Sequence, residues 1–232
     1  MASLNSLVAN HGTVLVVDSA STCVQAGLLR KGSDAIWARS RQEAGVAVFE
    51  VVAALLNSAH LEIRDIAAYG FCEGPGSLLG VRISAMALRT WRAVAPGHMP
   101  CTYAYRSLEL AAHELWRAGT PTPFAVIADA RRDTWHCVEI SSPSGAQPLR
   151  RLPAPVLAEM ASDLFLPADF RTWAAPPRTA QPVPYSIADL WRLQGDAELL
   201  LPLSEPDARF PEGPAYVSWT PRIHRAPNRA ST

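Results

Sequence analysis

The chain has 232 residues, of which 49% are hydrophobic and 18% charged, so it carries enough apolar side chains for a substantial core. Its formal net charge is zero, which gives no overall field that would attract nucleic acid or a membrane surface. No stretch approaches the roughly eighteen uninterrupted apolar residues of a membrane span, and residues 1–12 lack the basic start of a signal peptide. We therefore expect no membrane contact. The four cysteines lie far apart and suit small, reduced core residues, which predicts a cytoplasmic protein.

The first 119 residues alternate strand and helix patterns. Short apolar runs predict strands at 13–18, 22–29, 34–40, 66–71 and 101–103, and helical patterns cover 43–59, 81–94 and 107–118. The resulting order is β-β-β-α-β-α-β-α, which predicts an N-terminal lobe over residues 1–119 with a mixed sheet and helices. The fold class is therefore α/β.

The composition changes in the second half of the chain. Pro121 and Pro123 mark a seam, and strand patterns follow at 124–129 and 134–140. Fifteen of the twenty prolines lie beyond residue 140, where only a helix at 186–194 and a strand at 215–218 stand out. We expect a smaller, Pro-rich C-terminal lobe over residues 120–220 and a flexible basic tail over 221–232.

Residues 73–82 read Glu-Gly-Pro-Gly-Ser-Leu-Leu-Gly-Val-Arg, between an apolar strand pattern and a helix. Glycines there permit positive φ or close backbone approach, proline fixes φ, and Ser77 suits a helix N-cap. Such a loop is either a weak anion site on free N–H groups or a rigid structural corner. Arg82 could pair with a carboxylate such as Glu73 or reach a partner. The loop residues that we single out are Gly74, Pro75, Gly76, Ser77, Gly80 and Arg82.

The helical pattern at 43–59 is apolar nearly all round, which predicts burial on two sides. One stripe holds Val46, Phe49, Ala53 and Leu56, and a second holds Val48, Val51, Val52 and Leu55. The next helix also has surplus apolar bulk, and apolar surface of this kind marks association sites. The sequence does not decide which stripe faces outward. We predict a partner interface formed by Val48, Val51, Val52, Leu55, Ile83, Met86 and Arg89.

Four segments together resemble those of one known protein family. Residues 14–22, Val-Leu-Val-Val-Asp-Ser-Ala-Ser-Thr, resemble the opening strand and turn of the actin-like ATPase (ASKHA) fold. Residues 74–82 are similar to the family signature Gly-Pro-Gly-Ser-Phe-Thr-Gly-Leu-Arg, with Leu78 and Leu79 in place of Phe-Thr. Ile-Ala-Asp-Ala-Arg at 127–131 and Pro-Ala-Tyr-Val at 214–217 resemble two further segments of this family, which is the bacterial TsaB family, also called YeaZ. The resemblance implies an actin-like fold of two lobes, each a mixed sheet with helices.

The resemblance also implies a function. TsaB-like proteins are non-catalytic subunits of the machinery that makes N6-threonylcarbamoyladenosine (t6A) at position 37 of ANN-decoding tRNAs. They pair with the catalytic TsaD-like paralogue through helices of the N-terminal lobe and form homodimers through a similar surface. A TsaE-like ATPase would join through the complex, and contact with tRNA would be only indirect.

The residues themselves argue against independent catalysis. An actin-like ATPase needs glycines close to the ATP phosphates, but Ala20 follows Asp18 where glycine is required, and Ala-Arg-Arg follows Asp129. There is no His-x-x-x-His pair and no CxxC pair. We therefore expect no catalytic residue, no cofactor and no metal site.

Two other functional classes stay open. The first is an autonomous ATP-dependent small-molecule kinase of the actin-like fold. The second is a tRNA-binding module that uses Arg131-Arg132 and Arg150-Arg151, for which a neutral chain gives weak support.

Overall fold

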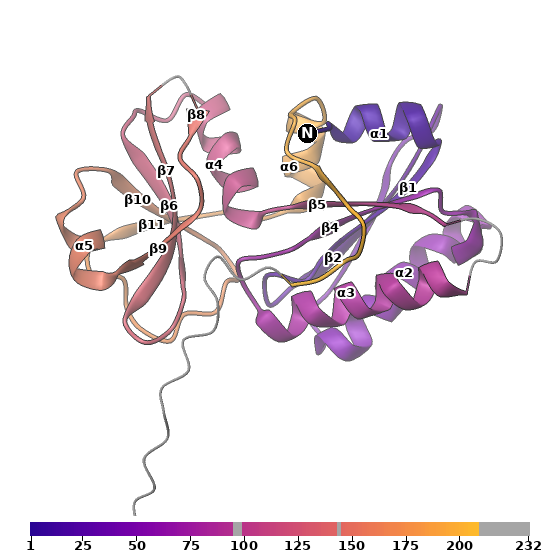
Figure 1. Cartoon of the computed structure of the whole chain (residues 1–232), viewed down its shortest axis with the longest axis horizontal. Helices are drawn as coiled ribbons and strands as arrows, with labels where there is room; N and C mark the ends of the chain where they lie inside the picture. The colour runs from indigo at the N-terminus through magenta and orange to yellow at the C-terminus, as the bar shows by residue number, and fades with distance from the viewer. Residues whose placement is uncertain (95–98, 143–144, 209–232) are drawn as a thin grey trace, which may run out of the picture.

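The computed structural model describes residues 1–94, 99–142 and 145–208, which form two lobes side by side (Figure 1). Each lobe contains a six-stranded mixed sheet with helices on both faces. This arrangement confirms the predicted α/β class with two lobes of mixed sheet. The strand predicted at 215–218 and the basic tail predicted at 221–232 lie outside the described residues.

The first sheet has the strand order β12-β5-β4-β1-β2-β3. Strand β1 pairs in parallel with β4, and β4 with β5, while β2, β3 and β12 join antiparallel to their neighbours. Helices α2 and α3 cover one face, and α1 and α6 lie on the other (Figure 1). The elements are β1 (Thr13–Asp18), β2 (Val24–Arg30), β3 (Ile36–Ser40), β4 (Ala68–Cys72), β5 (Cys101–Tyr105), β12 (Leu201–Leu203), α1 (Leu4–His11), α2 (Ala44–Ala59), α3 (Leu78–Ala93) and α6 (Ile187–Gln194).

The second sheet has the order β11-β10-β6-β7-β8, and β9 also pairs with β7. Strands β11, β10 and β6 run parallel, and the β6–β7 pair is an antiparallel hairpin. Helix α4 packs on one face against β6 and β7, and α5 covers the other face. The elements are β6 (Phe124–Asp129), β7 (Thr134–Ser142), β8 (Gly145–Ala146), β9 (Arg150–Pro153), β10 (Asp163–Pro167), β11 (Ala180–Val183), α4 (Ser107–Arg117) and α5 (Ala154–Glu159).

Alternation along β1 divides the core of the first lobe into two layers. Leu15 and Val17 point toward the α2–α3 layer, whereas Val14 and Val16 point to the opposite layer. All four side chains are fully buried, because helices cover the sheet on both faces. The layer of Val14 and Val16 continues into the second lobe through Val126 and Val138, so the two lobes share one hydrophobic core.

The predicted division of the chain into lobes at residues 119 and 120 needs correction for helix α4 and for the segment that contains α6 and β12. Helix α4, assigned to the N-terminal lobe over residues 1–119, packs on β6 and β7 of the second sheet. Helix α6 and strand β12, assigned to the lobe over 120–220, return to the first sheet, where β12 pairs with β5. The linear pattern of strands and helices does not reveal this return, because β12 is only three residues long and contains Pro202.

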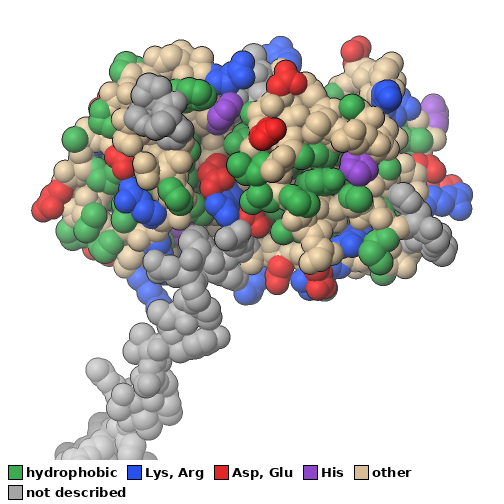
Figure 2. Space-filling model, turned by 45° about the horizontal axis from the view of Figure 1, so that its top comes forward, with side chains coloured by type: hydrophobic (Ala, Val, Ile, Leu, Met, Phe, Trp, Pro, Cys, Tyr) green, Lys and Arg blue, Asp and Glu red, His purple; other side chains and the backbone are tan. Residues whose placement is uncertain are grey.

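The surface shows no large region of one charge on the face in view (Figure 2). This agrees with the formal net charge of zero. Within the described residues no helix is long and apolar enough to span a membrane. All four cysteines are free, and Cys23, Cys72 and Cys137 are buried, as their positions in or beside apolar strands lead one to expect.

Candidate functional site

Helix α2 exposes apolar side chains at the surface, but they are not those of the stripe that we predicted for the partner interface. Val48, Val51, Val52 and Leu55 are at most 3% exposed and pack against the first sheet, so their assignment to a partner interface is wrong. Val46 and Phe49 of the other stripe are about half exposed, and Ala53 is exposed as well. The sheet lies on one side of α2 and therefore takes one stripe, and the second stripe is left at the surface except for Leu56, which is partly buried against the core.

Helix α3, which packs beside α2, also carries an exposed apolar side chain. Met86 is 55% exposed, and the Trp91 ring of α3 forms a T-shaped contact with the Phe49 ring of α2, with 6.0 Å between their centroids. Ile83, also predicted for the interface, is partly buried against the core of the lobe. We call Val46, Phe49, Ala53 and Met86 the α2–α3 face.

Arg89, which we also predicted to contact a partner, holds a later segment of its own chain. Its Nε donates to the Pro206 carbonyl at 2.7 Å, and its guanidinium lies 3.4 Å from the Glu205 carboxylate and 3.6 Å from that of Asp207. Arg92 donates to the Ser204 carbonyl at 2.9 Å. Residues 204–208 therefore run along one flank of α3 and leave Met86 uncovered.

The Gly-Pro-Gly loop between β4 and α3 is built as a rigid corner against the turn that follows β1. A Cβ on Gly76, whose φ is +151°, would lie 2.2 Å from the Ala20 carbonyl oxygen, and one on Gly80 would lie 2.3 Å from that of Ser19. The Ser77 amide donates to the Ala20 carbonyl at 2.6 Å, and Ser77 Oγ accepts the Gly80 amide at 3.3 Å as the α3 N-cap. The glycines thus serve close backbone packing, and these two amides are used within the chain.

The other end of the loop is anchored to the start of α4. The Ser107 amide donates to the Gly74 carbonyl and the Ser107 hydroxyl to the Pro75 carbonyl. Buried Glu73 pairs with Arg106 at 2.9 Å, and Arg82 is exposed. The geometry therefore supports the structural reading of the loop.

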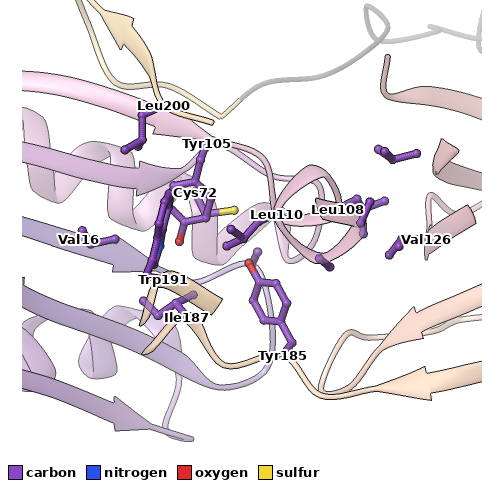
Figure 3. Close-up of a cluster of buried hydrophobic side chains, with 14 of the residues drawn as sticks. Val16, Cys72, Tyr105, Leu108, Leu110, Val126, Tyr185, Ile187, Trp191 and Leu200 are labelled. Atoms are coloured by element: carbon purple, nitrogen blue, oxygen red, sulfur yellow. The ribbon is translucent and has the colours of Figure 1, made fainter. Parts of the chain in front are cut away.

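Asp18 ends β1 fully buried, in the turn where an actin-like ATPase would meet the ATP phosphates. Its carboxylate accepts the hydroxyls of Tyr105 and Tyr185, both at 2.7 Å, and the Ala20 amide at 2.9 Å. Figure 3 shows both tyrosines in the cluster of buried side chains between the lobes. Burial raises the pKa of Asp18, and the two tyrosine hydroxyls oppose that rise. The Asp18 carboxylate is thus enclosed by its own chain, under a loop that is in contact with Ala20.

Asp129, at the end of β6, also has its oxygens occupied by its own chain. One oxygen accepts the Arg131 amide at 2.6 Å, and the other accepts the Trp173 and Ala174 amides at 2.6 and 3.0 Å. Asp129 therefore closes the β6–β7 turn and ties it to the loop after β10. Sequence reasoning did not find Trp173, Tyr105 or Tyr185, because each is a single aromatic residue outside any motif.

A cleft of about 320 Å³ lies between the two lobes. Its first wall is the Gly-Pro-Gly loop with the exposed Leu78 and Leu79, and its second wall comes from the β6–β7 turn, His136 and Arg151. Burial and the nearby Arg151 lower the pKa of His136 to about 4. Among the described residues no three metal-ligating side chains come together.

The chain has the actin-like ATPase fold that the resemblance implied, with two lobes of mixed sheet and helices. Two solved structures share this fold. YeaZ from Pseudomonas aeruginosa matches with a TM-score of 0.53 and 22% identity, over 67% of this chain and 75% of that chain. A protein described as similar to the peptidase YeaZ from Pseudomonas aeruginosa matches with a TM-score of 0.51 and 21% identity, over 78% and 91%. No family model and no curated protein matches the sequence.

Proposed function

We propose that this chain is a non-catalytic scaffold subunit that binds a catalytic TsaD-like paralogue and supports threonylcarbamoylation of adenosine 37 in ANN-decoding tRNAs. The observation that carries the proposal is the α2–α3 face, where large apolar side chains stay exposed on adjacent helices. The YeaZ-like fold supports the choice of partner. A TsaE-like ATPase would join through that partner, and a homodimer through the same face competes with it.

The turn after β1 is bonded and packed by its own chain, and this supports a scaffold over an enzyme. In the alternative, an autonomous ATP-dependent small-molecule kinase, the Asp18 turn would have to receive phosphates or their metal ion. Here Asp18 accepts three hydrogen bonds from its own chain, and Gly76 packs against Ala20. Calorimetric titration of the purified chain with ATP and Mg²⁺ separates the two functions, since the scaffold alone should release no binding heat.

Two matched valines provide the decisive test of the interface. Val46 on α2 and Val156 on α5 are 48% and 47% exposed, so replacing either by Glu leaves the fold intact. Only Val46→Glu places a charge in the proposed apolar contact. We expect Val46→Glu to reduce co-purification with the catalytic paralogue at least tenfold, because an unpaired charge would be desolvated in the complex.

Val156→Glu should co-purify as the unmodified chain does. Equal binding by both variants would show that the partner docks elsewhere. A change from dimer to monomer for Val46→Glu in the absence of the paralogue would assign the face to a second copy of this chain. Phe49→Glu gives an independent repeat from the same stripe.

A further inference from the structure

Two loops at the mouth of the cleft bring together an exposed tryptophan and several arginines. The first loop is the β6–β7 turn, with Arg131 and Arg132, and the second follows β10, with Arg171 and Trp173. The Arg131 guanidinium lies over the Trp173 ring, 4.5 Å from its centroid, and Trp173 is 61% exposed. A guanidinium that lies over an exposed indole provides a platform for a further aromatic ring.

The platform is held in place by the chain around it. Asp129 accepts amides from both loops, Thr134 Oγ1 donates to the Arg131 carbonyl at 2.6 Å, and Arg151 donates to Thr134 Oγ1 at 2.8 Å and to the Ala130 carbonyl at 3.1 Å. Residues 131–133 all have positive φ, between 50° and 63°, although none is glycine. Such strained backbone persists only where surrounding contacts impose it, and it concentrates at functional sites.

Two cavities meet at this platform. The cleft of about 320 Å³ and a neighbouring cavity of about 260 Å³ are both lined by Asp129, Arg131 and Trp173. A ligand that occupies both cavities must be elongated, and it must place a planar group against Arg131 and Trp173. This favours a chain of successive planar groups over one small molecule.

The charges around the two cavities favour an anion. Four arginines line them, and of the three lining carboxylates Glu73 pairs with Arg106 and Asp129 accepts three amides. Asp133 is the third. The local balance is therefore positive, although the whole chain is neutral. The rigid Gly-Pro-Gly loop has its Ser77 and Gly80 amides occupied, so the arginines are the natural anion contacts.

From these observations we propose that the cleft mouth binds single-stranded nucleic acid, with bases stacked on the Arg131–Trp173 pair and phosphates contacted by Arg132, Arg151 and Arg171. Stacking platforms combined with basic side chains are the general means of holding single strands, because every base has a π-face. The proposal adds a direct nucleic-acid contact to the indirect one expected from the resemblance. It does not rest on the proposed protein partner, since the isolated chain should show the binding.

The test is fluorescence anisotropy of the purified chain with a labelled single-stranded RNA of about 8 nucleotides, within the usual range of site sizes. Trp173→Ala should weaken binding at least about fivefold, the low end for one stacked base. The fold should tolerate this change because the Trp173 backbone amide, and not its ring, bonds Asp129. Trp173→Phe should keep most of the affinity.

Matched controls lie elsewhere on the chain. Trp116→Ala removes a partly exposed tryptophan from α4, and Arg64→Ala removes an arginine of the first lobe that is 68% exposed. Neither should change the affinity. Arg171→Ala should lower the slope of log affinity against log salt by about 0.7, the value for one phosphate contact on a single strand.

Four results would overturn the proposal. The first is that the chain does not bind the RNA at low salt, and the second is that Trp173→Ala and Trp116→Ala lose the same amount of affinity. The third is equal affinity for duplex and single-stranded RNA, and the fourth is that mononucleotides compete for the site as well as the oligomer does. Equal affinity for single-stranded RNA and DNA would support it, because stacking does not read the 2′-hydroxyl. Loss of binding to the catalytic paralogue in Val46→Glu, with RNA affinity retained, would show that the two sites are separate.

Discussion

Two valines five residues apart on α2 test the assignment of its faces in one experiment. Val51 is 3% exposed and packs on the first sheet, and Val46 is 48% exposed. Val51→Ala removes two buried methyl groups, which cost about 0.8 kcal/mol each in transfer free energy. The residual cavity raises the total to about 2–3 kcal/mol. Val46→Ala removes the same groups from a site already half in water, so its cost should stay below about 1 kcal/mol.

The measurement is the free energy of unfolding from urea titration followed by circular dichroism, compared among the three proteins at equal slopes of the transition. A loss of about 2–3 kcal/mol corresponds to a melting temperature about 5–10 °C lower for a chain of this size. Val46→Ala should shift it by no more than about 3 °C. Equal destabilisation by the two changes would mean that the α2 stripes are assigned to the wrong faces, and the proposed interface would fail with them.

Two further predictions concern the loop and the cleft. Gly76→Ala and Gly80→Ala should each cost about 3 kcal/mol or more in unfolding free energy, because each new Cβ would meet a backbone carbonyl. Gly45→Ala on α2 is the control, and it should be neutral or stabilising because no atom lies within 4 Å of the new Cβ. Equal melting temperatures for the three variants would contradict the packing of the loop against the β1 turn. Because the folded state disfavours the His136 imidazolium, stability should fall as the pH drops from about 6.5 to about 4, by at most about 3 kcal/mol. His136→Leu should flatten this part of the pH profile of the unfolding free energy, and an unchanged profile would exclude His136 as its cause.

Local patterns were sufficient to predict most of the first lobe. The predicted strands and helices up to residue 140 overlap β1–β7 and α2–α4, because apolar periodicity and Gly/Pro punctuation mark each of them. Helix α1 was missed, since its eight residues include three polar side chains and a histidine. Beyond residue 140, β9, β10, β11 and α5 were missed because prolines interrupt the pattern or stand beside it.

The site was harder to predict than the fold, for a physical reason. Periodicity showed that α2 has two apolar stripes, but the burial of a stripe depends on which side the sheet occupies. Val48 and Val46 are equally apolar, and only the tertiary structure separates them. Likewise, Asp18 and Tyr185 are 167 residues apart, and no local signal connects them.

The Asp18 cluster links the two halves of the chain through one ionisable group, and its pH dependence can test the geometry. Tyr105 and Tyr185 donate to the same carboxylate oxygen, and Tyr185 comes from the segment that returns to the first lobe. Tyr185→Phe removes a hydrogen bond to a charged acceptor, worth about 1.5–3 kcal/mol.

The sign of the pH effect follows from the raised pKa of Asp18. The folded state binds the proton more tightly than the unfolded chain, so stability is lost as the pH rises through the folded pKa. Without the Tyr185 hydroxyl that pKa rises further. The destabilisation by Tyr185→Phe should therefore be largest near neutral pH and should shrink as the pH approaches the unfolded value of 3.8.

Tyr69→Phe is the matched control for this measurement. Tyr69 is also fully buried in the first sheet, but its hydroxyl has no hydrogen-bond partner within the described residues. Its replacement should leave stability unchanged or higher at every pH. Tyr105→Phe should follow Tyr185→Phe, because both hydroxyls serve one oxygen. A destabilisation by Tyr185→Phe that is independent of pH would show that the carboxylate stays protonated at neutral pH, and that the cluster holds the lobes together as neutral groups.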